Sequence, residues 1–208
     1  MSRIILTFTA LGLLLLAGCS DDSSTGSDNT GPNMSGDIMP LAVGNVWSGT
    51  LYTYYTGGVL TDTLMYYITK DTVVEGETYY LMNIKRSGTH EPYAWYTLRD
   101  DGLYMAQCKN APSEGACQLF FKHPMTVGGI YTTDIGNDGI LDTMFLASSD
   151  EKITLKDQSH YCCVYQRLCQ DVVYGYFLSP GVGLVQSVEY SGYSYILWTL
   201  DTARLANQ

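Results

Sequence analysis

The stretch WSGTLYTYYTGGVLTDTLMYYITKDTVVEGETYYLMNIKR (47–86) consists of three Tyr-, Thr- and Val-rich segments, separated by Gly57-Gly58 and Glu75-Gly76. Tyr, Thr and Val are enriched in β-strands, and dipeptides ending in Gly accept the positive φ of tight hairpin turns. Between residues 60 and 68 apolar and polar positions alternate, which is typical of an antiparallel strand with one buried face. The stretch therefore predicts three consecutive antiparallel strands.

Strand-forming segments separated by turn residues continue through the rest of the chain, before and after residue 120. This pattern predicts the fold class. Residues 140–148 are the best helix candidate, and their helical period is poor. We therefore expect an all-β domain, an antiparallel meander of about a dozen strands that forms a half-barrel or a β-sandwich. The further expected strands are 92–99, 103–108, 129–135, 142–148, 152–155, 160–169, 172–179, 183–190 and 193–200.

One eight-residue phrase occurs twice, as PLAVGNVW (40–47) and as PMTVGGIY (124–131). Proline cannot donate a ladder hydrogen bond, so it marks the approach to a strand. We interpret each copy as the start of one half of the sheet, with Trp47 or Tyr131 as an anchor in the core. A pair of equivalent ligand loops is the functional alternative.

The segment YGYFLSPGVGLVQSVEYSG (174–192) resembles a motif of uncharacterised exported β-rich bacterial lipoproteins. In that motif an aromatic strand, Pro-Gly-Val-Gly and a Leu-Val strand form a hairpin, and such proteins often open with a phrase like PLAVGNVW. The resemblance implies an antiparallel β-rich fold, including a half-barrel like that of lipoprotein carriers. It implies no established catalytic residue.

The first 18 residues have the features of an export signal. Arg3 precedes the apolar run IILTFTALGLLLL, which as a helix would be roughly 20 Å long, too short for a hydrocarbon layer of about 30 Å. The following Leu16-Ala17-Gly18-Cys19 resembles the lipobox of bacterial lipoproteins. The resemblance implies cleavage before Cys19 and attachment of acyl chains, palmitate among them, so that the membrane is a partner of the chain through Cys19.

Residues 19–38 form the second expected region, the lipidated Cys19 followed by a disordered acidic tether. Ser, Asp, Gly, Asn and Thr dominate this segment and cannot bury enough apolar surface to offset the entropy of ordering. Ser20 occupies the place where Asp would resemble an inner-membrane retention signal, so the outer membrane is the expected location, facing the periplasm or the cell surface. Residues 39–208 are expected to fold as a single β-rich domain.

Charge restricts the partners of the domain. The chain has 21 acidic and 11 basic residues and a net charge of −10. Such a balance disfavours binding to nucleic acid.

Five cysteines remain besides Cys19. Cys108 and Cys117 bracket a polar loop, and beyond the inner membrane they are a candidate disulfide. Cys162, Cys163 and Cys169 lie on one expected strand, and at about 3.3 Å per residue the last two are too far apart to bridge. We expect buried structural thiols there.

The segment DIGNDGILD (134–142) resembles a calcium loop. Asp134, Asp138 and Asp142 match three ligand positions of the EF-hand pattern, but Gly136 and Phe145 stand where two further ligands belong. Asn-Asp-Gly between two strands is equally a hairpin turn. Calcium is therefore the one cofactor candidate, with a turn as the alternative.

No catalytic motif stands out. The chain has three scattered histidines, none of them in a metal-binding or nucleophile motif. We expect an outer-membrane lipoprotein that acts as a binding or structural module and is not an enzyme; its protein, glycan or lipid partner cannot be inferred. The alternative is a half-barrel carrier or sensor of an apolar ligand. A pocket lined by apolar side chains would favour the carrier, and a filled interior would favour the structural module.

Overall fold

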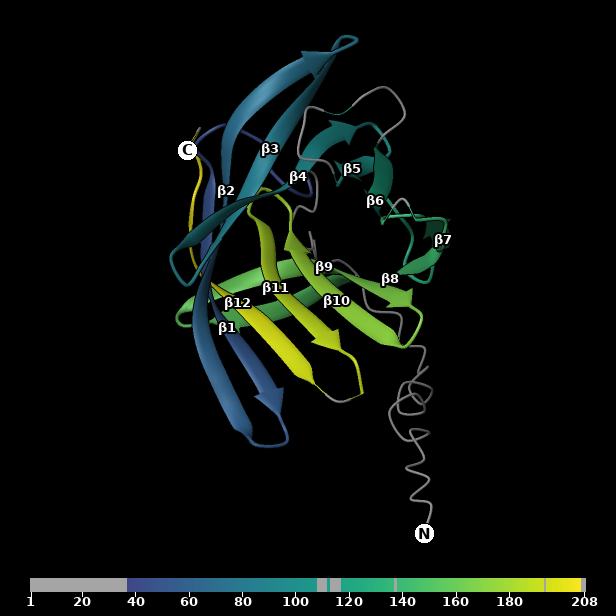
Figure 1. Ribbon diagram of the computed structural model, residues 1–208. Coiled ribbons are helices and arrows are strands. Elements are labelled where there is room, and N and C mark those ends of the chain that lie inside the picture. Colours follow the sequence, from purple (N-terminus) through teal and green to yellow (C-terminus); the bar gives the residue numbers. More distant parts are fainter. Residues whose placement is uncertain (1–36, 108–111, 113–116, 137, 193, 207–208) are drawn as a thin grey trace, which may run out of the picture. The chain divides into compact units, whose positions relative to one another are not determined.

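The computed structural model describes residues 37–107, 112, 117–136, 138–192 and 194–206, and these form one β-domain (Figure 1). In this part of the chain no helix is long and apolar enough to cross a membrane. The strands are β1 (Val46–Tyr55), β2 (Gly58–Val74), β3 (Glu77–Arg86), β4 (Thr89–Arg99), β5 (Gly102–Ala106), β6 (Gln118–Lys122), β7 (Ile130–Thr133), β8 (Asp142–Leu155), β9 (Gln158–Cys169), β10 (Val172–Ser179), β11 (Gly183–Tyr190) and β12 (Tyr195–Arg204).

All twelve strands belong to one antiparallel sheet with the order β6-β5-β4-β3-β2-β1-β12-β11-β10-β9-β8-β7. The sheet consists of two six-strand meanders, which are joined where β1 pairs with β12. Its two edge strands approach each other, because the Tyr131 hydroxyl on β7 donates to the Phe120 carbonyl oxygen on β6 (2.6 Å). The predicted all-β meander is confirmed, as a single sheet curled into a nearly closed barrel.

The first copy of the repeated phrase forms a turn that opens β1. Gly44 has φ of +95°, a conformation that Gly adopts without strain. Its N–H donates to the Ile68 carbonyl oxygen on β2 (2.9 Å), and the Asn45 carbonyl oxygen accepts from the Ile68 N–H (3.0 Å). Trp47 follows, fully buried, with its indole N–H donating to the Val182 carbonyl oxygen (2.6 Å).

The second copy forms the same turn before β7. Gly128 has φ of +80° and donates to the Leu146 carbonyl oxygen on β8 (2.8 Å), while the Gly129 carbonyl oxygen accepts from the Leu146 N–H (3.2 Å). Tyr131 packs against the core as a half-buried residue. Each copy thus opens one six-strand meander, and the structural interpretation of the phrase is confirmed.

The predicted Pro-Gly-Val-Gly hairpin is present between β10 and β11. Gly181 and Gly183 both have positive φ, +77° and +95°. A Cβ added to Gly183 would also lie 3.1 Å from the indole nitrogen of Trp47. The turn therefore packs on the anchor of the opposite meander, and Gly183 is required for that approach.

Two strands differ from the sequence-based expectation. Strand β6 was not expected, because QLFFK is a short apolar run without alternation. Strand β8 is continuous where two strands were expected, since its pairing with β9 shifts register around Ser148 and the polar Ser-Ser-Asp run lies in that irregularity. The strand expected at 142–148 is confirmed as the first part of β8, so the poor helical period of residues 140–148 forms no helix.

The barrel interior is the main core. Its largest fully buried side chains include Trp47, Trp198, Tyr165, Leu103 and Met144. Ile38 is also buried there, so the folded domain already includes the last residue of the expected tether.

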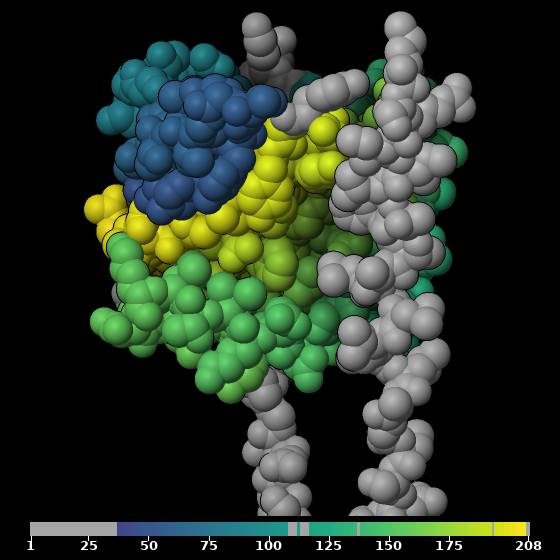
Figure 2. All heavy atoms as spheres, turned by 90° about the horizontal axis from the view of Figure 1, so that it is seen from below, coloured from purple at the N-terminus to yellow at the C-terminus, as the bar shows by residue number. Residues whose placement is uncertain are grey.

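A smaller cluster lies on the opposite face of β3, β4 and β5. It consists of Tyr79, Leu81, Trp95 and Ala106. Cys117, which precedes β6, packs against it. Figure 2 views the domain from another side and shows β1–β2, β11–β12 and the β8–β9 hairpin side by side on one face.

Candidate functional site

A pocket in the barrel interior is the candidate functional site, and we call it the aromatic pocket. It has a volume of about 60 Å³ and lies between β2, β4 and β6 of the first meander and β10 and β11 of the second. Leu184 and Ser187 of β11 contribute to its wall. Seven aromatic side chains line it: Trp47, Tyr66, Tyr93, Tyr96, Phe120, Phe121 and Tyr176.

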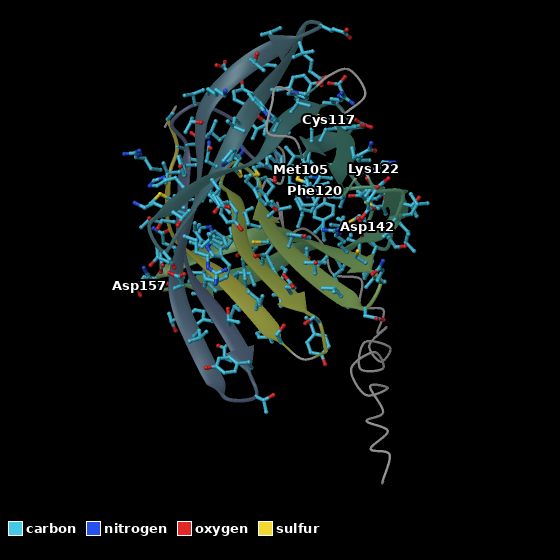
Figure 3. All side chains as sticks on the ribbon, viewed as in Figure 1. Met105, Cys117, Phe120, Lys122, Asp142 and Asp157 are labelled. Atoms are coloured by element: carbon cyan, nitrogen blue, oxygen red, sulfur yellow. The ribbon has the colours of Figure 1, made fainter. Side chains whose placement is uncertain are left out.

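Aromatic contacts hold these rings in place across the pocket. Phe120, labelled in Figure 3, reaches from β6 to Tyr176 on β10, with ring centroids 5.5 Å apart and an interplanar angle of 75°. Tyr66 lies edge-on to Trp198 at 5.4 Å and to Tyr93 at 6.1 Å. Edge-to-face pairs at such distances are favourable, so the pocket wall is preorganised.

Phenol hydroxyl groups are the main polar groups of the pocket. Those of Tyr66, Tyr93 and Tyr96 form no hydrogen bond with any residue that the structure describes. Burial raises the pKa of the Tyr66 and Tyr96 phenols above the ordinary value, because a phenolate would be poorly solvated there. They are therefore protonated at neutral pH and can act as hydrogen-bond donors.

Tyr93 lies at the mouth of the pocket. It lines the pocket and is nevertheless 42% exposed, whereas Tyr96 beside it on β4 is 3% exposed. A register irregularity between β3 and β4 lies next to Tyr93. Such bulges re-aim side chains near functional sites, and here the ring stands at the boundary between solvent and pocket.

A buried ion pair lies next to the pocket. The guanidinium Nη2 of Arg167 is 3.0 Å from the carboxylate Oδ2 of Asp142, whose side chain is 2% exposed. Arg167 also stacks on the Tyr174 ring at 4.8 Å, and its positive charge acts on the hydroxyl of Tyr176 in the pocket wall. The two charges therefore neutralise each other behind the pocket wall.

The calcium-loop residues are arranged as a turn. The Asp134 carboxylate accepts from the backbone N–H groups of Asp138 (3.1 Å) and Gly139 (2.9 Å). The Asp138 carboxylate accepts from the Ile140 N–H (2.9 Å), and Asp142 is paired with Arg167. No group of three His, Cys, Asp or Glu residues suited to a metal ion occurs in the described part of the chain. The geometry favours the turn, and calcium binding stays a prediction.

The cysteine predictions have different outcomes. Cys19 and Cys108 lie outside the described residues, so the lipidation site and the Cys108–Cys117 disulfide stay predictions. Cys162 and Cys163 are buried, and burial raises the pKa of the Cys162 thiol to about 12. A thiol that stays protonated is unreactive, which agrees with the predicted structural role of these two residues. Cys169 is only partly buried, because it is the last residue of β9, so the expectation of a buried thiol is wrong there.

A row of exposed apolar side chains crosses the outer face of the sheet. Val59, Tyr54, Tyr195, Tyr190 and Val173 pair in succession from β2 to β10, and each is at least 37% exposed. Directly paired residues lie on the same face, so this row is continuous. It is a second candidate contact surface, separate from the pocket.

The sequence did not identify the pocket residues. Its one signal was the excess of Tyr, 18 residues in the chain, which we interpreted as strand formers. The pocket requires that β4, β6 and β10 meet across the barrel, and no local pattern contains that information.

Comparison with known proteins gives two structural likenesses. The chain is similar to a candidate lipoprotein of Parabacteroides distasonis ATCC 8503, with 12% identity, a TM-score of 0.48, and coverage of 81% of this chain and 99% of that one. It is also similar to a candidate exported protein with a YmcC-like fold from Bacteroides fragilis NCTC 9343, with 13% identity, a TM-score of 0.48, and coverage of 82% and 100%. Neither likeness bears on what this chain binds.

The sequence matches no protein-family model, and no curated protein matches it.

Proposed function

We propose that the protein is a lipoprotein of the cell envelope that acts by binding, and that the aromatic pocket takes up an apolar end group of its ligand. The observation that supports this proposal is a preformed aromatic recess in which the hydroxyls of Tyr66, Tyr93 and Tyr96 have no partner among the described residues. Recesses with apolar walls and a few converging polar groups are typical of ligand sites.

The volume of the pocket restricts how the ligand is held. An apolar cavity of about 150 Å³ is needed to enclose benzene, and the aromatic pocket has about 60 Å³. Only a group of a few heavy atoms enters fully, and the rest of the ligand lies at the mouth beside Tyr93. The domain would recognise the end of an acyl chain or the edge of a ring rather than enclose a whole lipid.

Anchoring at the outer membrane is part of the same proposal. The complete lipobox around Cys19 supports it, since several acyl chains give stable membrane attachment. The anchor would hold the pocket close to ligands that partition into membranes.

We propose binding without catalysis. The charged side chains nearest to the pocket, Arg167 and Asp142, are paired with each other. The lining contains no acidic, basic or cysteine side chain that could act as a general base or nucleophile at neutral pH.

The test is a titration of the full-length protein with N-phenyl-1-naphthylamine, whose fluorescence rises in apolar surroundings. Ser187→Leu fills the pocket from β11, and Gln186→Leu, which adds the same side chain to the other face of β11, is the matched control. We expect binding that Ser187→Leu weakens at least about tenfold, corresponding to 1.4 kcal/mol, and that Gln186→Leu leaves unchanged. No binding, or equal binding by both variants with unchanged melting temperatures, would refute the proposal.

A further inference from the structure

We infer that the ligand group entering the aromatic pocket is uncharged and carries a hydrogen-bond acceptor, such as a carbonyl or ether oxygen, which receives a hydrogen bond from Tyr66 or Tyr96. This inference rests on the proposed binding function and specifies the chemistry of the ligand.

The hydroxyls of Tyr66 and Tyr96 differ from three other polar aromatic groups of the barrel interior. Trp47 donates to the Val182 carbonyl oxygen at 2.6 Å, Trp198 donates to that of Leu64 at 3.2 Å, and Tyr165 donates to that of Lys122 at 2.7 Å. Each of these groups has a backbone partner, as buried polar groups normally do.

Tyr66 and Tyr96 depart from that rule at the pocket. Neither hydroxyl has a partner within the described chain, although Tyr96 is only 3% exposed. A phenol that serves only for packing could be Phe. Neither hydroxyl is among the fully buried polar atoms without a partner in the described chain, so both are open to the pocket that they line. The two donors are therefore placed for an acceptor that the ligand supplies. Burial raises the pKa of both phenols, which keeps them in the donating form.

The lack of charged side chains in the pocket lining argues against ionic ligand groups. No Asp, Glu, Lys, Arg or His lines the pocket, so a charged group would lose its hydration without meeting an opposite charge, which is strongly unfavourable. Arg167 does not supply such a charge, because Asp142 pairs with it at 3.0 Å.

A cage for a quaternary ammonium ion is the rival interpretation, because aromatic faces attract cations. It accounts for the rings of the pocket but leaves the hydroxyl hydrogens without an acceptor. An acceptor ligand accounts for both the rings and the donors.

The experiment compares four probes of similar size on the full-length protein by isothermal titration calorimetry. Acetophenone carries an acceptor, ethylbenzene has the same shape without one, benzoate is an anion, and phenyltrimethylammonium is a cation. We expect acetophenone to bind about three- to tenfold more tightly than ethylbenzene, the range for one hydrogen bond. We expect benzoate and phenyltrimethylammonium to bind more weakly than ethylbenzene.

Two variants test whether the preference for acetophenone over ethylbenzene depends on the tyrosine hydroxyls. Tyr66→Phe with Tyr96→Phe should make acetophenone and ethylbenzene bind equally, with the affinity for ethylbenzene retained. Tyr190→Phe, at an exposed position on the outer face, should preserve the preference.

The outcomes separate the inference from the function on which it rests. Equal binding of acetophenone and ethylbenzene, or tightest binding of an ionic probe, would overturn the inference and leave an apolar-binding pocket. A preference that persists in the double variant would also overturn it. Failure of all four probes to bind would overturn both the inference and the proposed function.

Discussion

Replacing Trp47 with alanine tests whether the repeated phrase is a structural anchor. Trp47 is fully buried, it contacts the Gly183 turn of the opposite meander, and its indole N–H donates to the Val182 carbonyl oxygen at 2.6 Å. The alanine variant therefore removes a large core side chain and leaves a backbone carbonyl without its donor.

The expected loss is about 3–5 kcal/mol of unfolding free energy, the usual effect of truncating a large core aromatic residue. In a domain of this size that corresponds to a decrease of about 6–20 °C in melting temperature. Tyr131→Phe at the equivalent position removes only a hydroxyl, which donates to the Phe120 carbonyl oxygen. It should lower the free energy of unfolding by about 1 kcal/mol.

The assay is urea unfolding of the purified protein followed by far-ultraviolet circular dichroism, which does not depend on the removed indole. Val43→Ala and Val127→Ala are matched controls within the two copies of the phrase, at side chains that are 44% and 50% exposed. Both should stay within about 0.5 kcal/mol of the parent protein. A Trp47→Ala variant as stable as these controls would refute the anchor role and favour exposed ligand loops.

Three further predictions concern the surface, the membrane anchor and the turn. The pKa of Glu77 is lowered to about 2, chiefly by the hydrogen bond from Arg99. The ionised Glu77 therefore stabilises the folded state fully above its ordinary pKa of 4.5, and this stabilisation is lost as the pH falls from 4.5 toward 2. Because Glu77 and Arg99 are both partly exposed, the free energy of unfolding should fall by on the order of 1–2 kcal/mol over this pH range. The fall should be absent in acid melts of Glu77→Gln, and identical acid profiles of the variant and the parent protein would contradict the prediction. Cys19→Ser should move the protein out of the detergent phase in a phase-partitioning assay without changing its circular dichroism spectrum, and unchanged partitioning would exclude acylation at Cys19. Millimolar calcium should raise the melting temperature by less than about 2 °C if Asp134 and Asp138 only form a turn, whereas a larger shift that disappears in Asp138→Ala would show that the loop binds calcium.

The fold was predictable because its signals are local. Gly57-Gly58, Glu75-Gly76 and the Pro-Gly-Val-Gly turn each connect strands that are neighbours in both sequence and space. In a meander nearly every pairing is of this kind, so alternation and turn chemistry together determine the order of the sheet. The pairing of β1 with β12 is the exception, and nothing local in either strand indicates it.

The pocket was not predictable, because its residues come from strands that are far apart in the sequence. Tyr96 and Tyr176 lie on strands of different meanders, and Phe120 lies on a strand that the sequence pattern did not reveal. Their meeting depends on how far the sheet curls, which is set by twist and by register shifts such as those beside Met82 and Ser148. The partner of Asp142 was not predictable either, since the residue matches a calcium-ligand position in sequence and is paired with Arg167 in space.

The repeat also shows how the two meanders differ at the pocket. Trp47 pairs with Tyr66 across β1 and β2, and the equivalent Tyr131 pairs with Met144 across β7 and β8. Met144 is fully buried and fills its place, as flexible thioether side chains do. Tyr66 has a rigid ring, and its hydroxyl has no hydrogen-bond partner within the described chain. The shared turns build two equivalent meanders, and the difference between Tyr66 and Met144 gives only the first meander an unpartnered donor at this position.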